Sequence, residues 1–243
     1  MRIPRIFTDQ PLNIASEIQL EEAASAHLSR VLRLQQGYPV RLFNGTGGEY
    51  ACVISRIEKR HVTLTPEEFT TENHESPLKL HVVVGVSKGE KMDLIIQKCT
   101  ELGATSFQPL TTAHGDVRMD MQRWQKKQEH WRGVAISACE QSGKNLLPVI
   151  HPVLDFHTWL NQPGPNGGRY LFHPGGSARL SGITAQTDVV LCFGCEGGFS
   201  TEEVTTAEKA GVTITALGKR ILRAETAPIA VVAALQAIQG DLG

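Results

Sequence analysis

The sequence has no long hydrophobic run, few cysteines and almost no net charge. No apolar stretch reaches the roughly 20 residues that a membrane-spanning helix needs, and the charged start leads into no apolar segment of the signal-peptide kind. Five scattered cysteines do not form a disulfide framework, so we expect a cytoplasmic protein with reduced thiols. The formal net charge of −1 leaves any nucleic-acid binding to local basic patches.

Several common catalytic signatures are also missing. No Gly-x-Gly-x-x-Gly or Walker sequence occurs at a suitable place, which argues against a classical NAD or ATP site. The nine histidines are dispersed, and no Ser-His-Asp arrangement follows from their spacing. Cys192 and Cys195 form one Cys-x-x-Cys without a second pair at zinc spacing. Because Cys192 lies in an apolar run, we expect it to pack as a small hydrophobe and predict no metal site.

The most informative stretch spans residues 189–228 and contains two similar halves. In each half an apolar run of strand length breaks into a loop of glycine and charged residues, and a helix pattern follows. A strand, a glycine-rich turn and a helix N-terminus often hold a nucleotide-like ligand, because glycine lets backbone N–H groups come close. Ser200 and Glu203 form a capping box that predicts a helix over 200–210.

These two loops suit a ligand with a flat ring and a polar tail. Backbone groups at 194–198 and 217–222 are placed to hydrogen-bond such a ring, with Leu217, Ile221 and Leu222 enclosing it. The alternative is that their glycines only serve ordinary turns.

The amino-terminal 66 residues predict short strands and one helix near 20–35, with Ala24, Leu28 and Val31 on one face. Asn44-Gly45 predicts a hairpin turn. Arginines gather in this part of the chain, and they either face solvent or contact phosphates. The acidic and polar stretch 66–77 predicts a domain boundary.

After residue 78 the pattern alternates between strands and helices. We expect strands near 80–86, 106–110, 149–153, 169–173, 188–194 and 212–217, and helices near 89–102, 120–141, 200–210 and 225–239. This order predicts an α/β fold with a mostly parallel sheet covered on both faces. The last helix is apolar almost all round, so it should be buried against the sheet or a partner subunit.

Several motifs resemble those of a known family. The segment 194–200, Gly-Cys-Glu-Gly-Gly-Phe-Ser, resembles the Gly-Pro-Glu-Gly-Gly signature of knotted SPOUT methyltransferases, and 217–227 resembles their last motif. With further matches at 2–5, 27–33, 91–103 and 138–143, essentially the whole chain is similar to the ribosomal RNA small subunit methyltransferase E family. That family methylates N3 of a uridine in 16S rRNA.

The resemblance implies a PUA-like RNA-binding β-barrel at 1–72 and a SPOUT domain with a trefoil knot at 73–243. It also implies S-adenosyl-L-methionine as cofactor, 16S rRNA of the small ribosomal subunit as partner, and a homodimer. Position 195 is Cys where the family usually has Pro, and position 144 is Lys where Arg is common.

Mapped onto this sequence, the resemblance assigns candidate residues. For the cofactor they are Leu191, Phe193, Gly194, Glu196, Gly197, Gly198, Leu217, Gly218, Ile221, Leu222, Thr226 and Ala227. For RNA they are Arg2, Arg5, Arg30, Arg33, Lys91 and Lys144.

Chemistry at uridine N3 requires that the base lose a proton, and a nearby cation would stabilise the resulting anion. Arg223 is the first candidate, with Arg220, Glu140 and Glu225 as lesser ones. Glu225 alternatively orients Arg223 or caps the last helix. Two rival functions remain open, which are methylation of a ribose 2′-hydroxyl by a relative in the same superfamily and RNA binding without catalysis.

Overall fold

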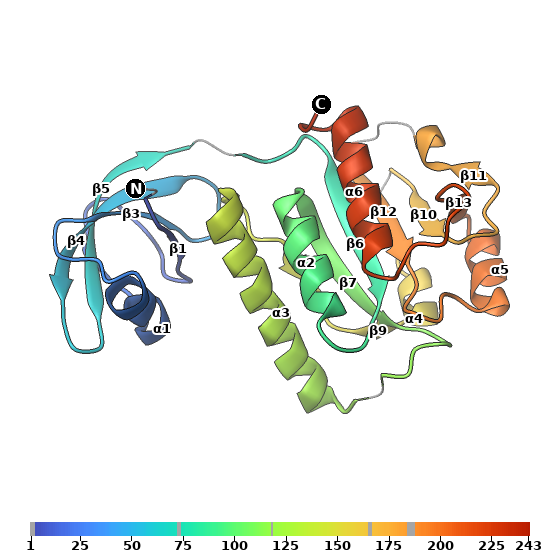
Figure 1. Ribbon diagram of the computed structural model, residues 1–243, viewed down its shortest axis with the longest axis horizontal. Coiled ribbons are helices and arrows are strands. Elements are labelled where there is room, and N and C mark those ends of the chain that lie inside the picture. The colour runs from blue at the N-terminus through green and yellow to red at the C-terminus, as the bar shows by residue number, and fades with distance from the viewer. Residues whose placement is uncertain (1–2, 72–73, 118, 165–166, 184–187) are drawn as a thin grey trace. The chain divides into compact units, whose positions relative to one another are not determined.

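The computed structural model describes residues 3–71, 74–117, 119–164, 167–183 and 188–243 (Figure 1). The chain divides into two compact units, Met1–Glu75 with Cys139–Leu147, and Ser76–Ala138 with Pro148–Gly243. The predicted boundary at 72/73 lies outside the described residues. The grouping of 139–147 with the first unit was not predicted, because chain order alone places it in the α/β part.

The first unit is built on a five-stranded sheet. Its strands lie in the order β1 (Arg5–Phe7), β3 (Pro39–Phe43), β4 (Glu49–Ile57), β5 (Val62–Thr70) and β2 (Ile18–Gln19). β1 and β3 are parallel and the other pairs antiparallel. Leu28, Val40, Leu42, Ile54 and Leu64 are buried in its core. Within the described part of the chain β1 and β2 do not pair, so the sheet is a partly open barrel (Figure 1).

Two details of this unit differ from the sequence prediction. Residues 66–70, expected in a linker, belong to β5, where Phe69 packs against Tyr50 with ring centroids 4.7 Å apart. The predicted helix consists of α1 (Glu22–Ala26) followed by a π-helical turn, His27–Val31. A π-turn holds more residues than an α-turn, so Leu28 is buried while Val31 is 67% exposed.

The second unit contains an eight-stranded sheet in the order β11, β13, β10, β12, β6, β7, β8, with β9 also paired to β7. All of these ladders are parallel, as predicted. The strands are β6 (Lys79–Gly85), β7 (Ala104–Thr111), β8 (Val149–Ile150), β9 (Leu154–Asp155), β10 (Arg169–Phe172), β11 (Ala178–Arg179), β12 (Asp188–Phe193) and β13 (Thr213–Ala216). The helices are α2 (Lys91–Glu101), α3 (Met121–Ser142), α4 (Phe156–Leu160), α5 (Thr201–Lys209) and α6 (Thr226–Gln239).

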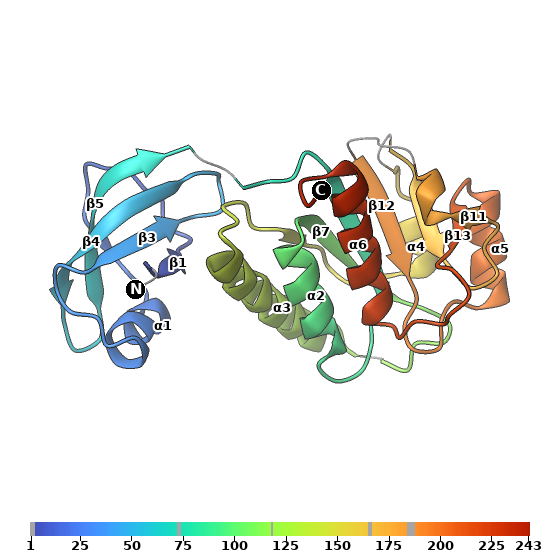
Figure 2. The same ribbon diagram turned by 45° about the horizontal axis from the view of Figure 1, so that its top comes forward.

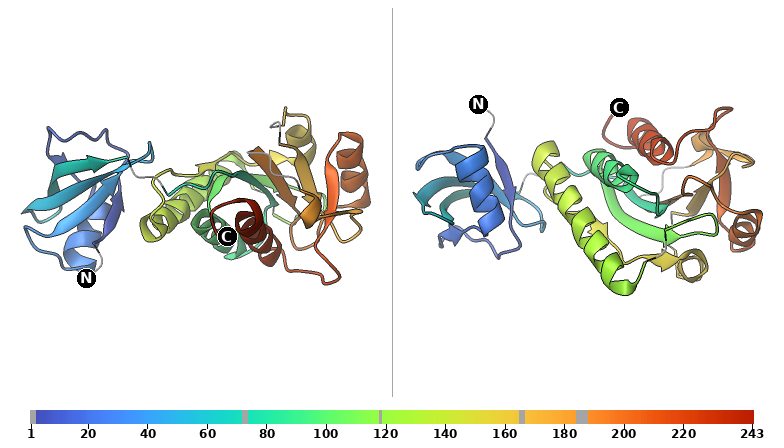
Figure 3. Two further views of the ribbon diagram at one scale, coloured as in Figure 1. Left: turned by 90° about the horizontal axis from the view of Figure 1, so that it is seen from above. Right: turned by 60° about the horizontal axis from the view of Figure 1, so that its bottom comes forward.

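Helices cover both faces of this sheet (Figures 2 and 3). On one face Val190 and Cys192 of β12 pack in a core with aromatic residues of α4 and with Ala207 of α5. On the other face α6 lies against α2 and β12. The chain therefore returns from β13, next to the sheet edge, to the middle of the sheet. Such a return is what the trefoil knot of the resembled superfamily requires.

The last helix is buried on one side only. Val231, Val232 and Leu235 are buried as expected, but Ala230 and Ala237 are exposed and Ile238 is 63% exposed. The prediction of burial is thus confirmed for one face of α6. Among the described residues, no helix is both long and apolar enough to cross a membrane.

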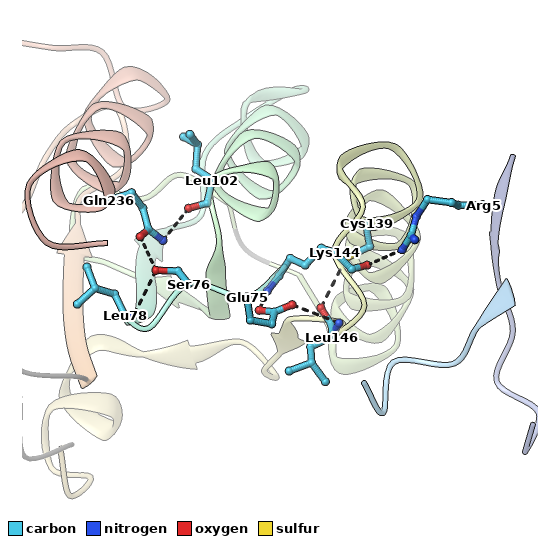
Figure 4. Close-up of polar contacts among 9 residues, drawn as sticks. All are labelled: Arg5, Glu75, Ser76, Leu78, Leu102, Cys139, Lys144, Leu146 and Gln236. Carbon is cyan, nitrogen blue, oxygen red and sulfur yellow. Dashed lines mark hydrogen bonds and ion pairs between the residues drawn. The ribbon is translucent and has the colours of Figure 1, made fainter. Parts of the chain in front are cut away.

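A buried glutamine ties α6 to the rest of the second unit (Figure 4). The amide nitrogen of Gln236 donates to the carbonyl oxygen of Leu102 at 2.9 Å, and its oxygen accepts from the hydroxyl of Ser76 at 2.6 Å. Ser76 in turn accepts from the N–H of Leu78 at 3.1 Å. Because Gln236 is completely buried, these bonds have no competition from water.

In the first unit, Glu75 is held separately (Figure 4). Its carboxylate forms an ion pair with Lys144 and accepts the N–H of Leu146. Two successive residues, Glu75 and Ser76, are therefore each fixed to their own unit.

Replacing Gln236 by leucine should lower the free energy of unfolding by about 1–3 kcal/mol, because the carbonyl of Leu102 then loses its donor in a buried place. Urea unfolding followed by circular dichroism measures this change. Gln122→Leu, at an exposed position of α3, is the control and should shift stability by less than about 0.5 kcal/mol. Equal urea midpoints for the two variants would contradict the stabilising role given to Gln236.

Candidate active site

A cavity of about 790 Å³ lies at the carboxyl ends of β10, β12 and β13. Its wall is formed by three segments that follow these strands, 172–174, 193–199 and 217–227, together with Lys91 of α2. Parallel strands end at the same edge of a sheet, so loops far apart in sequence meet there. The volume is in the range of small-molecule sites.

The loop after β12 is shaped by its glycines and closed by the predicted capping box. A Cβ on Gly194 would lie 2.8 Å from the backbone of Gly198, which itself has φ +69°. The hydroxyl of Ser200 accepts the N–H of Glu203 at 3.1 Å, and the Glu203 carboxylate accepts the N–H of Ser200 at 2.8 Å. The capping box that starts α5 is therefore confirmed.

Two of the glycines predicted to bind the cofactor, Gly197 and Gly218, have different structural roles. A Cβ on Gly197 would lie 2.7 Å from the Cβ of His114, whose ring nitrogen Nδ1 lies 2.9 Å from the Gly197 carbonyl oxygen. Gly197 is thus required by packing within the chain. Gly218 has φ +71°, but a Cβ there would meet no described atom within 4 Å. Its side is open, so a ligand can approach its backbone.

The walls of the cavity are partly aromatic. The rings of Phe172 and Phe193 stack with centroids 4.8 Å apart and an interplanar angle of 7°. Leu217 and Leu222 are half-buried, whereas Ile221 is 85% exposed. Ile221 is thus the exposed member of the three apolar residues predicted to enclose the ring.

The polar rim contains a satisfied carboxylate. Glu196 accepts hydrogen bonds from the Nζ of Lys91 at 2.8 Å and from the N–H of Lys88 at 3.2 Å. Burial by itself raises the pKa of Glu196, but these hydrogen bonds outweigh burial and lower the pKa below its ordinary value. The carboxylate is therefore held ionised.

A second carboxylate at the rim is not satisfied. The Oε2 atom of Glu225 is inaccessible to solvent and has no hydrogen-bond partner among the described residues. Glu225 occupies the N-cap position of α6 without a side-chain cap bond. Across the residues that the structure describes it also forms no ion pair with Arg223, so neither structural alternative predicted for Glu225 is found.

Arg223 begins α6 through its backbone and leaves its side chain exposed. Its carbonyl oxygen accepts the N–H groups of Thr226 at 3.0 Å and Ala227 at 3.1 Å. The residue lines the cavity and is exposed. Arg220, the other predicted cation, also lines the cavity and is exposed.

Most of the predicted cofactor-binding residues meet in this cavity. They are Phe193, Gly194, Glu196, Gly197, Gly198, Leu217, Gly218, Ile221, Leu222 and Ala227. Leu191 and Thr226 do not line it, since Leu191 is fully buried inside β12 and Thr226 is exposed beside it. The prediction missed Phe172, His173 and Pro174, although the end of a predicted strand was a signal for them.

Glu140, predicted as a catalytic candidate, lies in the first unit and does not line the cavity. Its carboxylate accepts the N–H of Phe7 at 3.0 Å, and burial raises its pKa. These contacts give Glu140 a structural role in the first unit, and its catalytic role stays a prediction.

The residues predicted to contact RNA differ in exposure. Arg2 lies outside the described residues. Arg30 and Arg33 are exposed. Lys91 lines the cavity and pairs with Glu196.

Two of these cations are internal supports of the first unit. Arg5 forms an ion pair with Glu49, donates to the side-chain oxygen of Asn145 at 2.8 Å and stacks on Phe43 at 4.8 Å. Lys144 is 5% exposed and pairs with Glu75. Both charges are thus paired inside the unit, and contact of these two residues with phosphates stays a prediction.

The cysteines of the Cys-x-x-Cys are both buried. Cys192 packs in the core beneath α4 and α5, and burial raises its pKa well above the ordinary value. Packing as a small hydrophobe, predicted for Cys192, is confirmed. Cys195 fills the loop, where its sulfur lies 3.5 Å from the hydroxyl of Thr112.

Models of two protein families match this chain. A family described as RNA methyltransferase domain matches residues 74–236, and one described as RNA methyltransferase PUA domain matches residues 20–67. Together with the parallel sheet, these matches confirm the predicted fold class.

Characterised relatives match along nearly the full length. Ribosomal RNA small subunit methyltransferase E of Buchnera aphidicola subsp. Schizaphis graminum is 33% identical, covering 99% of this chain and 98% of that protein. The Bacillus subtilis protein of the same name is 32% identical, covering 97% of both.

Two solved structures are similarly close. One is described as a methyltransferase from Legionella pneumophila in complex with the bound cofactor SAM; it has a TM-score of 0.95 and 34% identity, covering 99% of this chain and 100% of that one. The other is a ribosomal RNA small subunit methyltransferase E from Neisseria gonorrhoeae bound to S-adenosyl methionine, with a TM-score of 0.92, 32% identity and full coverage of both chains.

Proposed function

The chain belongs to the ribosomal RNA small subunit methyltransferase E family, and we propose that it transfers a methyl group from S-adenosylmethionine to N3 of a uridine in 16S rRNA. The observation that carries the proposal is the cavity at the ends of β10, β12 and β13, because it joins both family motifs in one site. Its aromatic wall, open glycine backbone and cationic rim match the chemistry of donor and acceptor.

The residues present fit the cofactor. Backbone groups of 217–222, and those of 194–198 that are not bonded within the chain, are suited to hydrogen-bond an adenine ring, and the exposed side chain of Ile221 would become covered by it. Lys91 and Glu196 offer opposite charges to a polar amino-acid tail. When bound, S-adenosylmethionine supplies a methyl group already attached to a good leaving group. The protein therefore has to align the donor with the acceptor and stabilise the charge that develops on the acceptor.

The acceptor needs more help than the donor. N3 of uridine carries a proton and is hidden in base pairs, so the enzyme must receive the base unpaired. As N3 loses its proton, negative charge spreads over the ring. The guanidinium of Arg223 remains charged at any working pH and is exposed at the cavity rim, so it is suited to stabilise that charge.

The remaining expectations concern assembly. The exposed apolar side of α6, made of Ala230, Ala237 and Ile238, suits a two-fold interface with a second copy of this chain. We propose a cytoplasmic homodimer acting on 16S rRNA of the small ribosomal subunit. Arg30 and Arg33 in the first unit are the exposed phosphate contacts in this scheme.

Analysis of the methylated product tests the function. Purified protein, S-adenosylmethionine and 16S rRNA, naked or in small subunits, should yield 3-methyluridine in a nucleoside digest analysed by mass spectrometry. A methyl group retained on the ribose fragment would instead identify a 2′-hydroxyl methyltransferase. The absence of any methylated nucleoside and of a thermal shift with the cofactor would favour RNA binding without catalysis.

Arg223→Ala should keep S-adenosylmethionine affinity within a few-fold and lose about 100-fold or more in single-turnover rate, the usual effect of removing one preorganised charge contact. Arg223→Lys should recover part of the rate if charge matters, and little if planar geometry matters. Calorimetry and single-turnover assays at saturating RNA measure the two quantities. Normal turnover by Arg223→Ala would mean that another cation stabilises the uridine anion.

Changing Arg30 and Arg33 together to alanine should weaken RNA binding and reduce its salt dependence, with a slope of log K against log salt that is lower by about one to two. Filter binding over a range of salt concentrations measures this slope. The control is the double change of Arg179 and Lys209, two exposed cations of the second unit. The idea fails if both double variants keep the wild-type slope.

A further inference from the structure

A second cavity, of about 890 Å³, adjoins the candidate cofactor site. It lies between the amino end of α2 and the middle of α3, and its wall includes Gly89, Leu94, His130 and Gly133. Lys91 and Glu225 line both this cavity and the first one. The second cavity therefore begins where the proposed donor site ends.

The wall of this cavity contains a glycine that the chain itself does not need. Gly133 lies well inside α3, where glycine is the poorest helix former after proline. A Cβ at this position would meet no described atom within 4 Å. Packing within the chain thus gives no reason for the missing side chain. Its absence leaves the helix backbone open to close approach by a flat group from outside.

The junction of the two cavities contains the unsatisfied carboxylate oxygen. Oε2 of Glu225 is inaccessible to solvent and lacks a partner among the described residues, which is costly for a charged acceptor. Lys91, which lines both cavities, is paired with Glu196. Because Glu225 lines both cavities, a ligand at their junction can contact its carboxylate.

The charges around the second cavity favour a nucleotide over an apolar partner. The Lys88 side chain at the mouth of the cavity is 64% exposed and pairs with Asp116, whose side chain is 73% exposed. Such an exposed ion pair contributes little to stability, so a phosphate can replace Asp116 as the partner of Lys88. His130 faces the cavity and lies 2.8 Å from Asp93. The wall thus offers a flat floor at Gly133, a cation at the mouth and an acceptor at the inner end.

We propose that the second cavity receives the substrate uridine, with the base lying against α3 at Gly133 and its N3–H donating to the carboxylate of Glu225. This inference rests on the proposed function. In the reaction the N3–H bond breaks, the proton passes to the Glu225 carboxylate, and the electron pair remains on N3. That pair becomes the nucleophile toward the adjoining donor site, and Arg223 at the same rim stabilises the anion.

Filling the floor tests the site. Gly133→Leu should abolish binding of uridine 5′-monophosphate to protein saturated with S-adenosylhomocysteine. Cofactor affinity should not change, and the melting temperature should stay the same or rise, because leucine favours the helix. Gln122→Leu on the same helix but outside the cavity is the control and should bind like the wild type. Unchanged nucleotide binding by Gly133→Leu overturns the site. If Gly133→Leu leaves nucleotide binding unchanged but alters the oligomeric state, the cavity is instead a contact between protein chains.

Variants of Glu225 test the proton acceptor by binding and by rate. Wild-type protein should prefer uridine 5′-monophosphate over the 3-methyl nucleotide by about tenfold or more, since the latter has no N3–H to offer. Glu225→Gln retains an acceptor oxygen, so it should keep this preference but lose about 100-fold in single-turnover rate. Glu225→Ala should lose both. Wild-type turnover by Glu225→Gln would refute the proton transfer.

These outcomes separate the inference from the function on which it rests. If wild-type protein forms no 3-methyluridine, the proposed function fails. If it does so, and Gly133→Leu and Glu225→Gln match it in binding and rate, only the acceptor site and its base are wrong.

Discussion

The close approach of two backbone segments at the carboxyl edge of the parallel sheet determines where the site forms. Gly85 ends β6, and a Cβ there would lie 2.5 Å from the backbone nitrogen of Cys195. Gly176, after β10, is equally close to the backbone of Thr215, at 2.5 Å. A side chain at either position would push a loop away from the sheet. Two of the three wall segments, those after β12 and after β10, are therefore placed by backbone contact, before any ligand is considered.

The elements of the second unit were predictable because their signals are local. Buried parallel strands read as continuous apolar runs, and the Ser200–Glu203 capping box starts a helix wherever the chain places it. The failures have nonlocal or geometric causes. Val31 is exposed because a π-turn breaks the 3.6-residue period assumed for the helix. Phe172 was missed because nothing in the sequence says that β10 lies between β12 and β13.

The arginines show why residue type alone does not assign a role. Arg5 and Arg30 both lie in motifs that resemble the family, yet Arg5 meets Glu49, 44 residues away, and Arg30 stays exposed. The partner that neutralises Arg5 is brought to it by the pairing of β1, β3 and β4. The number of basic residues in such a cluster is therefore an upper limit on the number of cations that can contact RNA. Folding decides which of them stay exposed.

The two carboxylates at the cavity rim carry this reasoning to the reaction itself. Glu196 accepts bonds from Lys91 and the backbone, which lower its pKa and hold it ionised as a fixed charge. Lys91 lines both cavities together with Glu225, and its ammonium is paired with Glu196. A carboxylate held ionised by a fixed cation is a poor proton acceptor. In the proposed reaction Glu196 is therefore a fixed charge, and the proton is assigned to Glu225, the other carboxylate at the rim.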